Sequence, residues 1–218
     1  MTATSGRRGR FISFEGPDGA GKSTQLRLLT ARLETAGHQV LCTREPGGTP
    51  LGEQLRALIL PSADTTNDPV AELLLLNAAR AQLVAQVIRP ALASGVVVLA
   101  DRYADATLAY QGYGRGGNLQ ELRTVIAIAT RGLQPDRTIL LDLPIDASLS
   151  RLTRRGVDNF FDRMGPEFRQ RVRDGFLALA RAEPERWVVV DGSQAVEVVA
   201  QYIWERVEPL VQAGRREP

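Results

Sequence analysis

Short apolar runs alternate along the chain with longer stretches in which apolar residues recur at helical spacing. The short runs are typical of buried strands and lie at Phe11–Glu15, Gln39–Thr43, Val96–Ala100, Thr138–Leu143 and Trp187–Val190. The longer stretches predict helices at Lys22–Ala36, Leu51–Leu60, Pro69–Ser94, Leu119–Arg131, Ala147–Arg154, Gly165–Arg181 and Ala195–Val211. Strands that alternate with helices favour an α/β fold, in which helices flank a doubly wound, five-stranded parallel sheet.

The domain organisation that follows is simple. The chain has 218 residues without an internal repeat or a low-complexity linker, so we expect one domain over residues 10–212. The small and polar ends, residues 1–9 and 213–218, are predicted to be flexible tails. A leucine run at Leu73–Leu76 lies between Glu72 and Arg80 and favours a core helix over a membrane segment.

Composition and charge narrow the classes of function. Hydrophobic residues make up 44% and charged residues 24%, which is typical of a globular protein. A net charge of only +2 does not indicate nucleic-acid binding. The one cysteine, Cys42, excludes an intrachain disulfide, and residues 1–10 lack the apolar stretch of a signal peptide, so we expect a cytoplasmic protein that has no membrane partner.

A glycine-rich motif between the first predicted strand and helix carries the strongest chemical signal. It has the pattern of a phosphate-binding loop (P-loop) and comprises Gly16, Pro17, Asp18, Gly19, Ala20, Gly21, Lys22, Ser23 and Thr24. Lys22 is the only lysine among the 27 basic residues, and it stands where a compact ammonium would reach the β and γ phosphates of ATP. The motif predicts a P-loop NTPase fold with ATP as co-substrate.

The end of the third predicted strand adds an acid and an arginine. Ser23 could hold Mg²⁺ through its hydroxyl oxygen, and Asp101 could hold it through water. Arg102, the next residue, could hold a second phosphate close to the first. Because no lysine exists outside the loop, the Asn-Lys-x-Asp motif by which GTPases read guanine is absent. This combination favours a kinase, with Lys22, Asp101 and Arg102 as catalytic candidates.

Taken together, these motifs resemble those of the bacterial thymidylate kinase family, whose members phosphorylate dTMP to dTDP with the γ-phosphoryl group of ATP. The resemblance covers nearly the whole chain and is most specific in the segment Arg44–Thr49 and in the stretch Asp101–Gln111, with further similarity over Asp162–Asp191. It implies a single nucleoside monophosphate kinase domain of a transferase in dTTP synthesis, Mg²⁺ as cofactor, and a homodimer.

The resemblance also implies roles for individual residues. Asp18 would contact the sugar 3′-hydroxyl, and Tyr110 would pack under the deoxyribose. Glu45 would lie near the transferring phosphates, with a cis bond to Pro46. Arg56 and Arg102 would grip the monophosphate, while Arg80, Thr107 and Gln111 would face the thymine edge. The chain has Leu76 where the family usually has a phenylalanine that stacks on thymine, and Ala106 where it often has serine.

An arginine cluster after the fourth predicted strand is the last candidate. Arg151, Arg154 and Arg155 lie on one face of a predicted helix. The P-loop has no arginine of its own, and one branch of the resembling family supplies a catalytic arginine from a mobile lid at this place. We therefore expect a lid at about residues 151–163.

Two alternatives remain open from the sequence alone. A kinase for another deoxynucleotide or nucleoside would share most of these motifs. A non-kinase P-loop ATPase would need only the loop and the Mg²⁺-binding acid.

Overall fold

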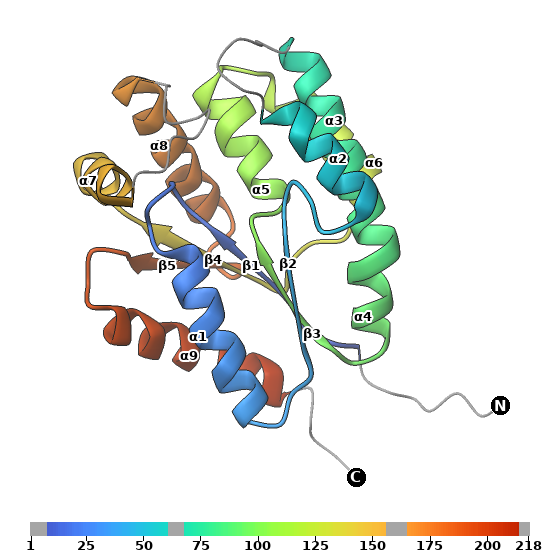
Figure 1. Ribbon diagram of the computed structural model, residues 1–218, viewed down its shortest axis with the longest axis vertical. Helices are drawn as coiled ribbons and strands as arrows, with labels where there is room; N and C mark the ends of the chain where they lie inside the picture. Colours follow the sequence, from blue (N-terminus) through green and yellow to red (C-terminus); the bar gives the residue numbers. More distant parts are fainter. Residues whose placement is uncertain (1–7, 61–67, 156–164, 214–218) are drawn as a thin grey trace, which may run out of the picture.

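A five-stranded parallel sheet forms the centre of the computed structural model, which describes residues 8–60, 68–155 and 165–213 (Figure 1). The strands are β1 (Phe11–Glu15), β2 (Val40–Arg44), β3 (Val97–Asp101), β4 (Arg137–Asp142) and β5 (Trp187–Asp191). Their order in the sheet is β2-β3-β1-β4-β5, and every neighbouring pair is parallel. The predicted strands and the α/β fold class are confirmed. The strand order reverses beside β1, and ligands bind at such points outside the carboxyl ends of the strands.

Helices cover both faces of the sheet because side chains of each strand point alternately to the two faces. On one face, α1 (Lys22–Thr35) and α9 (Val196–Gln212) pack on Ile12 and Phe14 of β1 and on inward residues of the other strands. Phe11 points to the other face and packs against residues of the long helical run that precedes β3. The remaining helices are α2 (Pro50–Ile59), α3 (Pro69–Leu83), α4 (Arg89–Ala93), α5 (Ala104–Thr107), α6 (Leu119–Thr130), α7 (Ile145–Arg155) and α8 (Pro166–Ala182).

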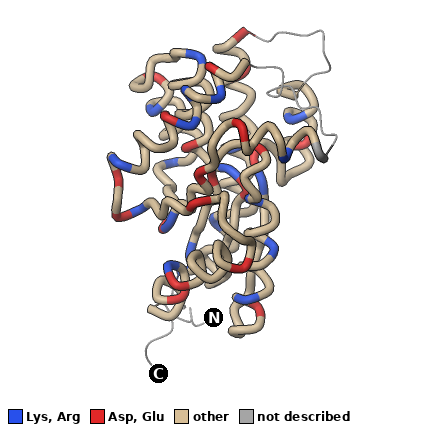
Figure 2. Tube along the Cα trace, turned by 90° about the vertical axis from the view of Figure 1, so that its left-hand side faces the viewer, with Lys and Arg blue, Asp and Glu red and all other residues tan. Residues whose placement is uncertain are grey.

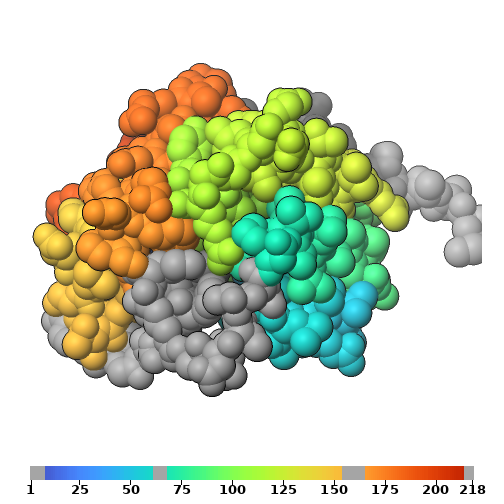
Figure 3. All heavy atoms as spheres, turned by 90° about the horizontal axis from the view of Figure 1, so that it is seen from above, coloured from blue at the N-terminus to red at the C-terminus, as the bar shows by residue number. Residues whose placement is uncertain are grey.

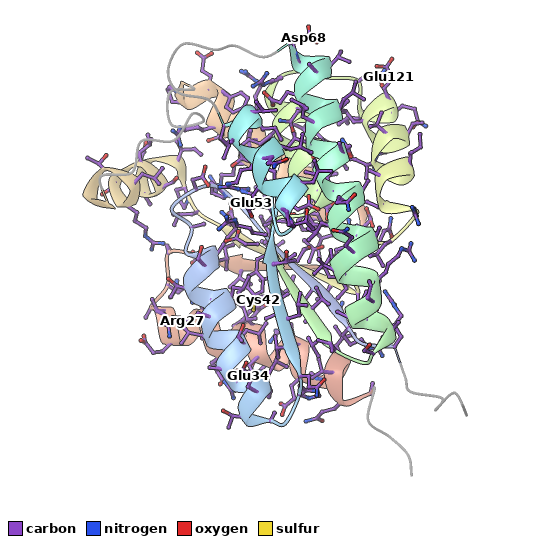
Figure 4. The ribbon with its side chains drawn as sticks, turned by 45° about the vertical axis from the view of Figure 1, so that its right-hand side comes forward. Arg27, Glu34, Cys42, Glu53, Asp68 and Glu121 are labelled. Atoms are coloured by element: carbon purple, nitrogen blue, oxygen red, sulfur yellow. The ribbon has the colours of Figure 1, made fainter. Side chains whose placement is uncertain are left out.

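The long helix predicted at Pro69–Ser94 is continuous but not uniform. Asp68 caps its start, accepting hydrogen bonds from the backbone N–H groups of Val70 and Ala71 at 2.9 and 3.2 Å (Figure 4). Between α3 and α4 a π-helical segment, η1 (Val84–Ile88), precedes Pro90. Proline has no N–H to donate, and its ring crowds the carbonyl four residues earlier, so the backbone hydrogen-bond pattern is disturbed there.

The leucine-rich part of this helix lies against neighbouring helices. By length and composition alone, the run Pro69–Ala93 could cross a membrane, and 44% of its most apolar window is buried in the fold. Here α3 packs against α2 and α6 and buries Leu73, while Val70 and Leu74 on the same helix stay exposed.

The segment after β3 is helical although no helix was predicted there. Residues 104–114, which lie between the predicted strand Val96–Ala100 and the predicted helix Leu119–Arg131, form α5 followed by a π-helical segment, η2 (Leu108–Gly114). Gly112 and Gly114 disfavour a helix by intrinsic propensity, yet each lies against side chains of neighbouring helices where a Cβ would collide, at 2.5 Å from Leu119 and 2.7 Å from Phe168. Tertiary packing therefore imposes the helical backbone, which orients the polar residues of this segment.

A buried ion pair holds this segment to the sheet. Arg186, just before β5, donates two hydrogen bonds to the carboxylate of Asp105, at 2.6 and 3.0 Å. The same guanidinium donates to Thr138 of β4 at 2.7 Å. At the N-terminal side, Gly9 is buried and donates to the carbonyl of Leu92 at 2.7 Å, so packing begins before Arg10.

Charged residues of both signs are interspersed along the chain, as Figure 2 shows. This distribution fits the small net charge of +2.

Candidate active site

A cleft lies at the carboxyl ends of β1 and β3, where the P-loop and the segment after β3 meet. It consists of two adjoining cavities, which both contact Asp18, Glu45, Arg56 and Arg102. Viewed from above, α7 and α8 lie on one side of the η2 segment and α2 and α3 on the other (Figure 3). The cavity over the P-loop is lined further by Gly19, Gly21, Lys22, Ser23, Thr24, Arg44, Asp101 and Leu152. The second cavity is lined further by Pro46, Ile59, Leu60, Leu76, Arg80, Tyr103, Ala106, Thr107, Tyr110 and Gln111.

The P-loop takes the conformation that its glycines allow. Gly16, Gly19 and Gly21 have φ angles of 130°, 79° and 97°, and a Cβ on Gly16 would lie 2.4 Å from the carbonyl oxygen of Leu141. The Nζ of Lys22 donates hydrogen bonds to the carbonyl oxygens of Gly16 and Pro17 at 3.1 and 2.9 Å. Burial lowers the pKa of Lys22 to about 8. The ammonium thus lies at the base of the cavity over the loop, within reach of an anion bound there.

Two oxygen-bearing side chains meet beside the loop. The hydroxyl of Ser23 donates to Oδ2 of Asp101 at 3.0 Å, which joins the first turn of α1 to the end of β3. Hydroxyl, carboxylate, water and phosphate oxygens are the ligands that Mg²⁺ prefers. No cluster of three or more His, Cys, Asp or Glu residues that could hold a metal occurs in the described part of the chain. The Ser23–Asp101 pair therefore fits a cation that takes its other ligands from phosphate and water.

Arg102 connects the two cavities. Its backbone is left-handed, with a φ of 69°, an unusual conformation for a residue other than glycine. Its guanidinium donates to the carbonyl of Gly16 at 3.1 Å, to Oδ1 of Asp18 at 2.7 Å and to the hydroxyl of Tyr110 at 3.0 Å. Burial opposes the charged form of Asp18, but Arg102 and Lys22 outweigh it and lower the pKa of Asp18 to about 2. Asp18 is an ionised acceptor at the junction of the cavities.

Tyr110 forms part of the wall between Arg102 and α8. Its side chain is buried, and its ring packs edge-on against Phe176 with the ring centroids 6.1 Å apart. The Arg102 guanidinium lies over the same ring at 4.9 Å from its centroid. Packing on one side and the cation on the other fix the ring in place.

The far end of the second cavity contains a buried arginine. Arg80 is 2% exposed and donates to Glu45 at 2.8 Å, to Asn77 at 2.7 Å and to Thr107 at 2.9 Å. Leu76 lies one helical turn before it on α3 and lines the same cavity. Glu45, which we expected near the transferring phosphates, lines both cavities, but its Oε2 is committed to Arg80.

The bend after β2 positions a second arginine. The Glu45–Pro46 peptide bond is cis, as the resemblance implied. Thr49 caps α2 by accepting a hydrogen bond from the N–H of Gly52 at 2.9 Å. From α2, Arg56 donates to the carbonyl of Pro46 at 2.8 Å and lines both cavities beside Arg102.

The arginine cluster is described only in part. On α7, Nη1 of Arg151 lies 3.5 Å from the carbonyl oxygen of Gly19, and Ser148 donates to the carbonyl of Asp18 at 2.6 Å. Helix α7 is therefore joined to the P-loop. The side chains of Arg154 and Arg155 and residues 156–163 of the predicted lid lie outside the described residues.

The structure adds residues that sequence reasoning missed. Glu72 is buried and accepts a hydrogen bond from Gln111 at 2.7 Å, and Asn77 is an acceptor for Arg80. A signal for Glu72 was present, because residues 72, 76 and 80 lie at intervals of four and share one helical face. Glu15 is also fully buried, and its Oε1 accepts a hydrogen bond from the N–H of Tyr103 at 2.8 Å.

Comparison with known proteins agrees with this geometry. A family model described as thymidylate kinase matches residues 14–203. The chain belongs to the thymidylate kinase family. It is 50% identical over 200 residues to the thymidylate kinase of Deinococcus radiodurans, with 92% of this chain and 97% of the relative covered. It is also 50% identical over 211 residues to the thymidylate kinase of Thermomicrobium roseum, covering 95% and 99%.

A solved thymidylate kinase confirms the fold assignment. The crystal structure of the Ehrlichia chaffeensis protein matches with a TM-score of 0.74 and 32% identity, covering 92% of this chain and 99% of that one. This thymidylate kinase family member thus has the P-loop NTPase fold and is an ATP-dependent nucleotide kinase, a phosphotransferase. The alternative of a non-kinase ATPase is not favoured.

Proposed function

We propose that this chain transfers the γ-phosphoryl group of ATP to the 5′-phosphate of dTMP and so forms dTDP in dTTP synthesis. The observation that carries this proposal is the meeting of two cavities at Arg102 and Asp18, one over a P-loop and one shaped by a tyrosine, a buried arginine and an amide. Such an arrangement suits a reaction that must bring two phosphorylated nucleotides together. Family membership supports the choice of dTMP as acceptor.

ATP would occupy the cavity over the P-loop. The backbone N–H groups of residues 16–24 would cradle its phosphates at the N-terminus of α1, and Lys22 would reach the β and γ phosphates. Ser23 would hold Mg²⁺ directly and Asp101 would hold it through water. The cation, when bound, neutralises negative charge on the phosphates.

The deoxynucleotide would occupy the second cavity. Arg56 and Arg102 would grip its 5′-phosphate with forked guanidinium groups, and Asp18 would accept a hydrogen bond from the sugar 3′-hydroxyl. The Tyr110 ring would occupy the space of a ribose 2′-hydroxyl. Toward the base, Thr107 and Gln111 would contact the polar edge together with Arg80, while Leu76 would cover the ring by apolar contact.

Catalysis would consist of positioning and charge neutralisation, without a covalent intermediate. Lys22 and Arg102 would neutralise part of the charge on the transferring group, and an arginine of α7 would neutralise the rest. Arg151, Arg154 and Arg155 are the candidates, because α7 is attached to the P-loop through Ser148. A lid at residues 151–163 within a single domain of residues 10–212 is part of this proposal.

The proposal also includes the oligomeric state of the protein and its cellular compartment. Leu58 of α2, Val70 and Leu74 of α3 and Ile128 of α6 are between 55% and 75% exposed, on helices that lie side by side (Figure 1). Exposed apolar groups on neighbouring helices are typical of an interface. They support a homodimer through these helices. A cytoplasmic enzyme with ATP and dTMP as its binding partners, and no nucleic acid or membrane, fits the composition and the mixed surface charge.

The decisive experiment measures ADP formation from ATP with dTMP, dUMP, dCMP, dGMP and thymidine as separate acceptors. We expect dTMP to give the highest kcat/KM and dTDP as product. A different preferred acceptor would identify a different deoxynucleotide or nucleoside kinase. ATP hydrolysis that is independent of any acceptor would contradict the kinase proposal.

A further inference from the structure

Glu72 lies directly behind the amide that faces the second cavity. Its side chain is 1% exposed, on the helical face of α3 that also carries Leu76 and Arg80. Its Oε1 accepts a hydrogen bond from Nε2 of Gln111 at 2.7 Å, and its Oε2 accepts one from Arg115 at 2.9 Å. A buried carboxylate is expensive unless paired, and Arg115 supplies the countercharge. Both oxygens therefore have defined donors.

The contact with Glu72 determines which end of the Gln111 amide points away from it. An ionised carboxylate only accepts hydrogen bonds, whereas the amide has a donor end and an acceptor end. Turning the amide over would place its Oε1 against a carboxylate oxygen, which is repulsive. Gln111 is thus held with Nε2 on Glu72, and its Oε1 is the acceptor that remains for a ligand in the cavity that Gln111 lines.

This orientation matches one class of pyrimidine. A 4-oxo pyrimidine such as thymine has an N3–H donor, which a carbonyl oxygen can accept. A 4-amino pyrimidine has a bare N3 acceptor in the same place, which would face the amide oxygen without a proton between them. A site built for a hydrogen-bond donor rejects a ligand that lacks it, because a buried polar group is then left unpaired.

We propose that Glu72 is a positioning residue that makes the site select 4-oxo over 4-amino pyrimidines by holding the Gln111 amide in one orientation. The inference rests on the proposed function, in which Gln111 faces the base. Glu72 does not line the cavity itself and acts through Gln111.

A carboxylate is required at position 72 because two donors compete for it. In Glu72→Gln the new amide has only one acceptor, for both Gln111 and Arg115. Hydrogen bonds from a charged donor are the stronger, so the new carbonyl is expected to turn to Arg115. Its NH₂ group then faces Gln111, whose amide turns over and presents Nε2 to the base. The substitution should therefore weaken the discrimination between the two pyrimidine classes.

The test compares kcat/KM for dTMP and for 5-methyl-dCMP, which differs from dTMP only in the 4-substituent and the proton at N3. The variants are the wild type, Glu72→Gln, Gln111→Ala and the double variant. The dTMP preference is the ratio of kcat/KM for dTMP to kcat/KM for 5-methyl-dCMP. We expect Glu72→Gln to lower this ratio by about tenfold or more. In the Gln111→Ala background the same substitution should change the preference by less than about twofold, because the residue through which Glu72 acts is gone.

A matched control separates orientation from stability. Ile126→Ala, on α6, removes buried volume from the hydrophobic cluster that also contains Leu73, the neighbour of Glu72 on α3. It should lower the thermal midpoint while leaving the kcat/KM ratio of dTMP to 5-methyl-dCMP unchanged. Should Glu72→Gln not fold, Glu72→Met removes the acceptor without burying a new amide and is expected to lose the preference as well. An unchanged preference in a folded Glu72 variant, or an equal loss in both Gln111 backgrounds, overturns the inference. A wild-type enzyme that does not phosphorylate dTMP would instead refute the proposed function.

Discussion

Arg102 and Asp18 form an ion pair with a distance of 2.7 Å between Nη2 and Oδ1, and this pair joins the segment after β3 to the P-loop. Each partner comes from the carboxyl end of a different strand, β3 and β1, which are neighbours in the sheet. Both side chains line both cavities. The pair holds the Arg102 guanidinium toward the junction of the two cavities, where the two substrates would meet. A phosphate bound there would compete with Asp18 for this guanidinium.

The first prediction concerns Lys22. Replacing it by alanine removes the ammonium that would neutralise the transferring phosphoryl group, and the loss of one such donor costs roughly 10² or more in kcat. We expect Lys22→Ala to fold and to lose nearly all turnover. Lys22→Arg is the informative companion. It replaces the compact ammonium that donates to the carbonyl oxygens of Gly16 and Pro17 with a larger, planar guanidinium, so we expect it to be impaired as well. A kcat of the alanine variant within about tenfold of wild type would exclude this role.

Tyr110 is predicted to exclude a 2′-hydroxyl. In Tyr110→Ala the gap in kcat/KM between dTMP and ribothymidine 5′-monophosphate should narrow, because the ring held by Phe176 and Arg102 is gone. Tyr110→Phe keeps the ring and loses only the hydroxyl that accepts from Arg102, so it should retain the gap. A folded alanine variant with the wild-type ratio would show that the tyrosine is structural.

The sheet and most helices could be predicted from the sequence because buried strands and amphipathic helices leave a periodic signal. The P-loop could be placed for a different reason, since its glycines and Lys22 follow a pattern imposed by phosphate chemistry. The helical segment 104–114 could not, because its glycines argue against a helix and only packing against α6 and α8 enforces it. Glu72 was missed because it acts on Gln111 rather than on a ligand, and this contact appears only when α3 is placed beside η2. Asn77 was missed because it acts on Arg80, another side chain of α3, rather than on a ligand.

Glu15 is predicted to make stability depend on pH between about 5 and 8. Burial, together with the nearby Asp105, raises the pKa of Glu15 to about 8, against the opposing effects of Arg102, the N–H of Tyr103 and Lys22. The folded state therefore binds the proton more tightly than the unfolded state, whose pKa is near 4.5. The stabilisation is complete below about pH 4.5 and is lost as the pH rises toward 8.

Glu15→Gln provides the measurement. The amide keeps an oxygen for the N–H of Tyr103 but cannot titrate. One unit of pKa difference corresponds to about 1.4 kcal/mol, so from pH 5 to pH 8 the wild type should lose at least about that much free energy of unfolding relative to the variant. Asp18, with its pKa of about 2, affects the comparison only at lower pH, and Lys22, with its pKa of about 8, affects it chiefly at higher pH. The free energies of unfolding come from urea titrations of both proteins at each pH. The same pH dependence in the wild type and in Glu15→Gln would contradict the prediction.

The proposed homodimer predicts a specific effect of charge on α3. Leu74 is 55% exposed, and Leu74→Glu would place a charge in the proposed interface. We expect light scattering to show a monomer for this variant and a dimer for the wild type. Val198→Glu is the matched control, since Val198 is 57% exposed on α9, which packs on the opposite face of the sheet. A wild-type monomer, or a dimer that persists equally in both variants, would place the interface elsewhere or exclude it.

The arginines of α7 carry the last prediction. Phosphoryl transfer builds negative charge on the γ-phosphoryl group, and the P-loop has no arginine of its own to neutralise it together with Lys22. Helix α7 is fastened to the loop, because Ser148 donates to the carbonyl of Asp18 at 2.6 Å and the guanidinium of Arg151 lies 3.5 Å from the carbonyl of Gly19. A guanidinium from this helix can therefore approach bound ATP without moving the whole domain. We expect single alanine replacements of Arg151, Arg154 and Arg155 to include at least one that lowers kcat by orders of magnitude while the KM values for ATP and dTMP change little. Arg137→Ala, at the opposite end of β4, serves as the charge-matched control and should leave kcat unchanged. If all three variants of the cluster keep a kcat near that of the wild type, the cluster is a solvated surface, and the charge on the transferring group must be neutralised by Arg102, Lys22 and Mg²⁺ alone.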